Sequence, residues 1–106
     1  MTTYLGNAFS LNMLEISADG IQVEIQPVSP SEIPAEAVSI VGHVDMAAIL
    51  SGILNRNVEV NRESVTMLED DILFVAQYHG ARLPAGATEL PSDARIDFYR
   101  ITTIKE

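Results

Sequence analysis

The stretch Ile72 to Tyr78 (ILFVAQY) decides the fold class, because it is almost continuously apolar and rich in residues that favour strands. A strand of this composition is typical of the centre of a sheet that is covered on both faces. We therefore predict that residues 72–78 form the central strand. Gln77 interrupts the apolar run. A buried glutamine needs hydrogen-bond partners, so its amide is either satisfied by the backbone or directed at a site near the strand end.

Further strands are predicted on both sides of this stretch. Ile21, Val23 and Ile25 alternate with polar residues, which is the pattern of a half-buried strand. The same alternation returns near the end of the chain. We expect strands at 3–8, at 21–26, at 58–67 as one strand or a bent pair, and at 96–104, where the last strand closes the sheet.

Helical spacing is clearest after His43, where apolar and small residues recur at intervals of three and four through Leu54. Asp45 falls in the first turn, where the helix dipole favours an acid. Shorter helical segments are predicted at 9–14, with Ser10 as its cap, and from Ser29, while residues 80–91 form a long loop. The expected architecture is a single mixed α/β domain over residues 1–106. Its central sheet of about five strands is flanked by two or three helices.

Composition narrows the possible functions. The chain has 106 residues, of which 47% are hydrophobic and 20% charged, as in an ordinary globular domain. It has no cysteine, which excludes disulfides and thiolate chemistry. Fifteen acids against six bases give a net charge of −9, which argues against a general binder of long nucleic acid. We find no secretory signal and no apolar run long enough to span a membrane, and we expect a cytoplasmic protein.

His43 and Arg82 are the candidates for chemistry. His43 follows Gly42 at a predicted helix start, where free N–H groups and the dipole favour a phosphate and an imidazole could protonate a leaving oxygen. Arg82 lies in the long loop, and its planar guanidinium suits phosphate. The alternatives are an exposed histidine beside a helix cap and a solvated loop arginine. Arg62 follows Asn61 in a predicted strand, where an edge arginine is commonplace.

A second group of residues is suited to binding a polar ligand. Asn7, Ser10 and Asn12 crowd a predicted strand-to-helix junction, where they either cap and turn the chain or present amide and hydroxyl groups to a ligand. Tyr78 and His79 are the nearest rings for stacking on a base, although core or surface roles are the simpler interpretation. Neither the histidine spacing nor the acidic run 69–71, which we interpret as a solvated turn, indicates a metal site. No cofactor is expected.

Five segments taken together resemble one known family. They are YLGNAFSLNML (4–14), GHVDMAA (42–48), VEVNR (58–62), VAQYHGARLPAGATELP (75–91) and IDFYRI (96–101). In order and spacing they are similar to the viral-type anti-CRISPR ring nucleases, a family formerly known only as a domain of unknown function. The resemblance covers nearly the whole chain.

The resemblance implies a homodimer in the cytoplasm of a prokaryotic host. Such a dimer would bind cyclic tetra-adenylate, the second messenger of type III CRISPR defence. It would open the ring without a metal, giving linear products with 2′,3′-cyclic phosphate ends. The implied proton donor is His43 and the implied phosphate-stabilising residue is Arg82. The implied ligand-binding residues are Asn7, Ser10, Asn12, Arg62 and Gln77.

The loop departs from the family pattern at one catalytic position. The family usually has R-L-x-E-G, whereas this chain has Arg82-Leu83-Pro84-Ala85-Gly86. Ala85 therefore replaces the glutamate that assists catalysis, through either a natural loss or an engineered change. Two other functions stay open. One is a non-catalytic sponge that sequesters the same ring. The other is a small phage or mobile-element interaction protein without a nucleotide ligand.

Overall fold

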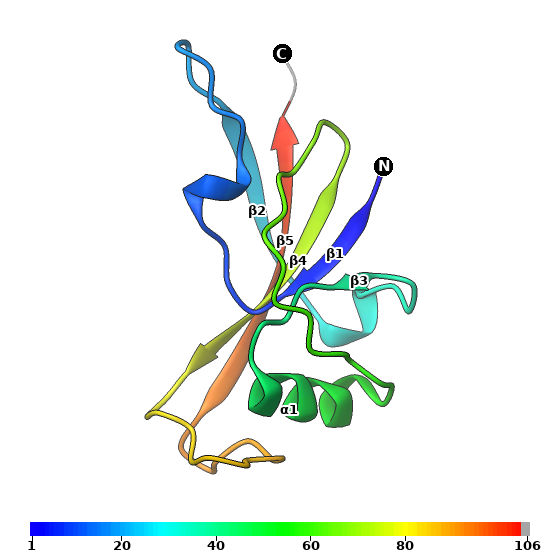
Figure 1. The fold of residues 1–106 in the computed structure, drawn as a ribbon, viewed down its shortest axis with the longest axis vertical. Helices are drawn as coiled ribbons and strands as arrows, with labels where there is room; N and C mark the ends of the chain where they lie inside the picture. Colours follow the sequence, from blue (N-terminus) through cyan, green and yellow to red (C-terminus); the bar gives the residue numbers. More distant parts are fainter. Residues whose placement is uncertain (105–106) are drawn as a thin grey trace.

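The strand predicted to be central lies in the middle of a five-stranded sheet (Figure 1). The structure is a computed structural model that describes residues 1–104. The strands are β1 (Thr3–Gly6), β2 (Gln22–Val28), β3 (Val38–Ser39), β4 (Ile72–His79) and β5 (Arg95–Ile104). Their order across the sheet is β2-β5-β4-β1-β3, which confirms the predicted mixed α/β class.

The sheet combines parallel and antiparallel pairs. Strand β1 runs parallel to β3 and β4, whereas β5 runs antiparallel to β4 and β2. Because β1 and β4 are parallel neighbours, their carboxyl ends meet at the same end of the sheet. The last strand, β5, lies between β4 and β2. The prediction that the last strand closes the sheet is therefore wrong, because β2 forms that edge of the sheet.

Among residues 1–104 there is one α-helix, α1 (Val44–Leu54), with two short 3-10 turns, η1 (Leu11–Met13) and η2 (Pro30–Glu32). The predicted helix at 44–54 is confirmed. The helix predicted at 9–14 is reduced to η1, and Ser10 at its start makes no side-chain cap. Ser29 and Glu32 form a capping box around η2, with Pro30 at its start. Pro34 follows at once, and residues 34–37 form a turn.

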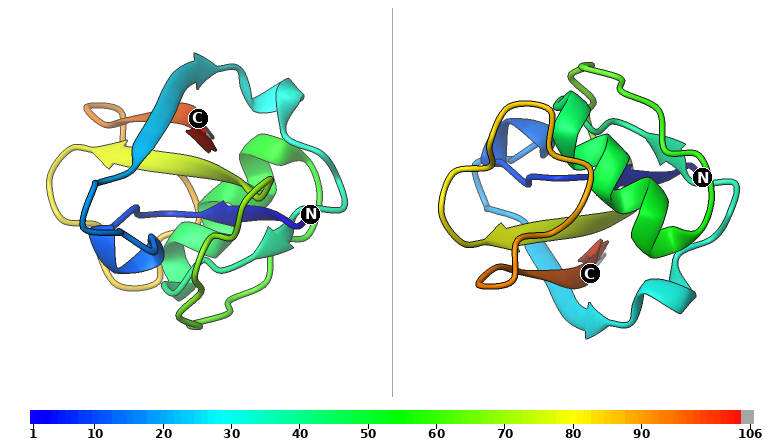
Figure 2. Two further views of the ribbon diagram at one scale, coloured as in Figure 1. Left: turned by 90° about the horizontal axis from the view of Figure 1, so that it is seen from above. Right: turned by 90° about the horizontal axis from the view of Figure 1, so that it is seen from below.

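Alternation along the strands divides the core between the two faces of the sheet. Leu5, Phe74 and Phe98 belong to the core cluster that also contains Met46 and Leu50 of α1. The helix therefore covers this face, as Figure 2 shows from below. The opposite face holds a second cluster: Met67, Leu73, Val75 and Ile101, with Phe9 and Met13 packed against it. The predicted central strand is thus covered on both faces over its first half.

The strand or pair of strands predicted at 58–67 is wrong. Only single bridges occur there, one between Val60 and Val41 and one between Met67 and Leu14. The sheet edge that this segment reaches is β3, which is two residues long. In place of backbone pairing, a side-chain hydrogen bond joins this segment to β3: Asn61 Nδ2 donates to the Ser39 carbonyl at 2.8 Å.

The acidic run 69–71, predicted to be a solvated turn, is only partly so. Asp71 is 4% exposed. Its two carboxylate oxygens accept hydrogen bonds from the backbone N–H groups of Thr2 and Leu68, each at 2.8 Å. Asp71 therefore ties the N-terminus to the turn that precedes β4, and its burial is possible because both oxygens have partners.

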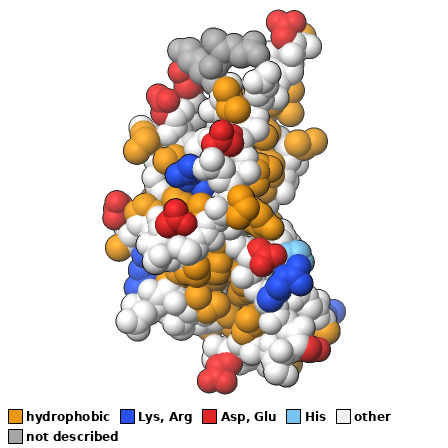
Figure 3. Space-filling model, turned by 180° about the vertical axis from the view of Figure 1, so that it is seen from behind, with side chains coloured by type: hydrophobic (Ala, Val, Ile, Leu, Met, Phe, Trp, Pro, Cys, Tyr) orange, Lys and Arg blue, Asp and Glu red, His pale blue; other side chains and the backbone are white. Residues whose placement is uncertain are grey.

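Hydrophobic side chains are also present on the surface, and Figure 3 shows them gathered along the middle of the back of the molecule. The most exposed large ones include Leu11 at 70% and Ile25 at 52%. Within the described chain no helix is both long enough and apolar enough to cross a membrane.

Candidate functional site

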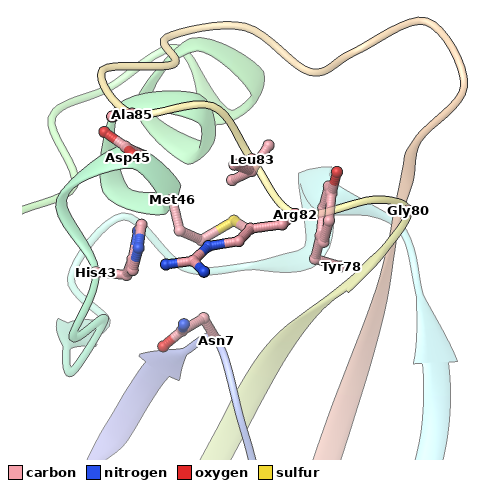
Figure 4. Close-up of a pocket in the computed structure, with 9 residues that line it drawn as sticks. All are labelled: Asn7, His43, Asp45, Met46, Tyr78, Gly80, Arg82, Leu83 and Ala85. Carbon is pink, nitrogen blue, oxygen red and sulfur yellow. The ribbon is translucent and has the colours of Figure 1, made fainter.

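A pocket opens where the carboxyl ends of β1 and β4 meet the start of α1 (Figure 4). Its volume is about 670 Å³, within the usual range for a small-ligand site. The residues that line it are Asn7, His43, Asp45, Met46, Tyr78, Gly80, Arg82, Leu83 and Ala85. The pocket thus collects residues from three separate parts of the chain: the end of β1, the start of α1, and the end of β4 with the loop that follows it.

His43 is the residue immediately before α1 and lines the pocket from that end. Its backbone is extended, with φ −132° and ψ 124°, and its carbonyl accepts the Ala47 N–H at 3.0 Å. Its side chain makes no capping hydrogen bond and is exposed on the pocket side. The N–H groups in the first turn of a helix lack intrahelical partners and favour an anion. His43 therefore sits where a phosphate and a transferable proton can meet.

Arg82 enters the pocket from the loop after β4. In Figure 4 its guanidinium points across the pocket towards His43 and lies above Asn7. Within the described part of the chain Arg82 has no hydrogen-bond or ion-pair partner. An arginine without an acid partner keeps all its donors available for a phosphate.

The start of this loop is held close to the sheet. The Tyr78 hydroxyl donates to the Ala81 carbonyl at 2.6 Å. A Cβ on Gly80 would approach the Ala94 Cβ to 2.7 Å and the Tyr78 hydroxyl to 2.8 Å, so the chain passes here only with glycine. The direction in which the loop leaves β4, and hence the placement of Arg82, is fixed by this packing.

Asp45 was predicted in the first turn of the helix but not as a residue of the site, and it lines the pocket. It lies in the first turn of α1 and is half-buried, and Figure 4 shows its carboxylate on the side of the pocket where Ala85 lies. Ala85 offers only a methyl group. The acid that the pocket contains is therefore Asp45. The signal was its position two residues after His43, which places both at one helix start.

Of the eight site residues that the resemblance implied, four line this pocket: Asn7, His43, Arg82 and Ala85. Ser10 and Asn12 line a neighbouring cavity of about 240 Å³ that shares Asn7 with the first. Arg62 lines neither and contacts Gly42 instead.

Gln77 also lies away from the pocket. It is exposed, so its expected burial is wrong. It follows Ala76, which faces α1, so the alternation of the strand directs Gln77 to the opposite face. Its amide donates to the Tyr78 carbonyl at 3.4 Å.

Tyr78 and His79, the two candidate rings, separate at the end of β4. Tyr78 is half-buried and lines the pocket. His79 does not line it, and its Nε2 lies 3.1 Å from an Asp97 carboxylate oxygen. Across residues 1–104 no group of three or more His, Cys, Asp or Glu side chains is arranged to hold a metal ion.

The fold and site define a small α/β domain with a polar pocket, containing an arginine and a histidine, at the end of its central strands. Residues 3–99 match the model of the STIV B116-like family, and the chain belongs to this family. Among solved structures it is similar to B116 of Sulfolobus turreted icosahedral virus, with a TM-score of 0.76 and 21% identity. That match covers 96% of this chain and 99% of B116, so the two share a fold along their whole length. No curated protein matches the sequence.

Proposed function

We propose that this protein binds cyclic tetra-adenylate and cleaves it without a metal, leaving linear products that end in a 2′,3′-cyclic phosphate. One observation carries the proposal. His43 and Arg82, 39 positions apart in the sequence, line one pocket, and within the described chain neither side chain has a hydrogen-bond or ion-pair partner. The family resemblance supplies the ligand, and the pocket supplies groups that suit its chemistry.

In the proposed reaction the substrate provides its own nucleophile. A ribose 2′-oxygen forms a bond to the adjacent phosphorus, the bond from phosphorus to the 5′-oxygen breaks, and no water is consumed. The 2′-hydroxyl loses its proton to solvent. The 5′-oxygen receives a proton from the His43 imidazolium, which solvent then recharges. Arg82 stabilises the negative charge that grows on the phosphoryl oxygens.

Because this chain has Ala85 where the family has a glutamate, binding of the ring is better supported than rapid cleavage of the ring. The family glutamate at this position assists the proton transfer, and a methyl group cannot do so. Asp45 is a carboxylate in the same pocket, but it comes from α1 rather than from the loop. We therefore expect slow cleavage. The second candidate function, sequestration of the ring without cleavage, is favoured by this same substitution.

The proposal includes a homodimer in the cytoplasm of a prokaryotic host. A ring of four identical nucleotides has rotational symmetry, which a two-fold interface can match by presenting the same pocket twice. The exposed hydrophobic side chains, such as Leu11 and Ile25, supply apolar surface that a partner copy would cover. Light scattering with and without the ring tests this part, and a monomer in both conditions would exclude it.

The decisive experiment is incubation with cyclic tetra-adenylate in excess chelator, followed by chromatography of the products. We expect linear fragments with cyclic phosphate ends from the parent protein and none from His43→Ala. Ring binding without product would identify a sponge. Cleavage that appears only with added Mg²⁺ or Mn²⁺ would contradict the mechanism. If the ring does not stabilise the protein, the third alternative remains, which is a small interaction protein that has no nucleotide ligand.

A further inference from the structure

Tyr78 lines the pocket, but its hydroxyl group is bonded to the backbone of the loop that follows β4. The hydroxyl donates to the Ala81 carbonyl oxygen at 2.6 Å, towards the short end of the usual range for such a bond. That carbonyl belongs to the peptide group that joins Ala81 to Arg82. The bond therefore holds the peptide from which Arg82 starts, and Tyr78 lies across the pocket from His43 (Figure 4).

The two ends of this loop also meet beside Tyr78. His79 and Arg95 are the last pair in the register of β4 and β5, so Gly80 and Ala94 are the first loop residues on either side. A Cβ on Gly80 would come within 2.7 Å of the Ala94 Cβ, so no side chain fits between the two segments. The base of the loop is therefore narrow, and the Tyr78 hydroxyl fixes the first peptides that leave it.

Beyond this base, the Arg82 side chain depends on its backbone for direction. Within residues 1–104 its guanidinium has no hydrogen-bond or ion-pair partner. A long side chain of this kind can take many conformations, and ordering it in one of them costs entropy. A fixed starting peptide reduces that cost, because fewer directions remain open to the guanidinium before a phosphate arrives.

We propose that Tyr78 is a positioning residue for Arg82: its hydroxyl holds the Ala81–Arg82 peptide so that the guanidinium extends across the pocket. This inference rests on the proposed function for its effect on cleavage. A residue that acts through Arg82 loses its effect once Arg82 is removed. A residue that contacts the ligand independently keeps its effect in that background.

The variants are Tyr78→Phe, Arg82→Ala and the two combined. Phenylalanine removes one oxygen atom and keeps the aromatic side chain at the pocket wall, so the change is confined to the lost hydrogen bond. The matched control is Tyr4→Phe, which also removes a tyrosine hydroxyl. Tyr4 packs against the core cluster on the other face of the sheet and does not line the pocket.

Three quantities are measured: affinity for cyclic tetra-adenylate by calorimetry, the single-turnover rate with saturating enzyme, and the Arg82 Nε–H signal of the free protein by NMR, assigned with Arg82→Ala. We expect Tyr78→Phe to weaken binding about threefold to tenfold and to slow cleavage about 10- to 100-fold, as for a displaced catalytic group. The Arg82 signal should shift or broaden. In the Arg82→Ala background the same change should alter affinity and rate by less than about twofold. Tyr4→Phe should alter none of the three.

Equal losses with and without Arg82 would overturn the proposal and make the Tyr78 hydroxyl a ligand contact. Unchanged affinity, rate and Arg82 signal in Tyr78→Phe would overturn it as well. If the parent protein binds cyclic tetra-adenylate without cutting it, the proposed nuclease activity fails, while the affinity comparison still decides the role of Tyr78. If the parent protein does not bind it, the Arg82 signal decides, and an unaltered signal in Tyr78→Phe rejects the proposal.

Discussion

Replacing His43 by asparagine is expected to stabilise the fold and to abolish cleavage at the same time. His43 occupies the position before the first turn of α1 with extended backbone angles, φ −132° and ψ 124°, but makes no side-chain capping bond. Asparagine at such a position accepts a hydrogen bond from the N–H group two or three residues later. The parent protein therefore has an uncapped helix start at its pocket.

The size of the gain follows from this geometry. A good capping side chain contributes about 1 kcal/mol relative to a residue that makes no cap. Four residues of α1 are buried, Met46, Ala47, Ile49 and Leu50, so the helix unfolds with the core and the gain reaches global stability. For a domain of this size, about 1 kcal/mol raises Tm by roughly 4–8 °C. Loss of general-acid catalysis costs roughly 10²- to 10⁴-fold in rate.

Thermal unfolding by circular dichroism and single-turnover cleavage measure the two effects on the same samples. His43→Ala should lose cleavage without the gain in Tm, because alanine cannot cap. His79→Asn should keep cleavage, because His79 lies outside the pocket beside Asp97. A lower Tm for His43→Asn would refute the helix-start geometry, and cleavage at the parent rate would refute the role of His43 as proton donor.

Three further changes test other parts of the structure. Ala85→Glu should raise the single-turnover rate without tightening ring binding, since a carboxylate here acts on proton transfer; an equal or slower rate would show that this position does not limit the chemistry. Arg82→Ala should remove a charge-assisted phosphate contact, weaken binding by about 1.5–3 kcal/mol in calorimetry, and slow cleavage; unchanged affinity would contradict this. Asp71→Ala should leave the Thr2 and Leu68 N–H groups without their acceptor and lower the urea-unfolding free energy by about 2–4 kcal/mol, whereas a loss under 1 kcal/mol would count against it.

The parts of the fold that were predictable are those with a strong local pattern. The apolar run of β4 fixed its central place, because only a strand covered on both faces tolerates so many apolar side chains. The helix at 44–54 was equally clear from its spacing. In contrast, the alternation at 58–67 was misleading, since a strand also needs an edge to pair with, and β3 offers only two residues. Strand β3 was missed because two residues show no period.

The site was predictable only in part, for a similar reason. His43 and Arg82 were selected from their residue types and the resemblance. Their meeting in one pocket depends on β3, which precedes His43, and β4, which precedes Arg82, both running parallel to β1. Asp45 was predicted as a first-turn acid, which is a common helix feature, and only its place two residues after His43 linked it to the site. The contact between Arg62 and Gly42 joins residues 20 positions apart, and no periodicity signals it.

The net charge of −9 and a pocket suited to an anion are compatible because charge acts locally. Exposed charges separated by more than about 8 Å are largely screened at physiological salt, so the distant acids oppose a phosphate in the pocket only weakly. A long nucleic acid would continue past the pocket and place its phosphates against an acidic surface with few bases to neutralise them. A closed ring of four nucleotides keeps its phosphates close together. The charge distribution that we expect to oppose binding of a polymer therefore leaves Arg82, which has no partner among residues 1–104, available to a compact anion. Among the residues that line the pocket, Asp45 is the one acid that would face this anion at short range.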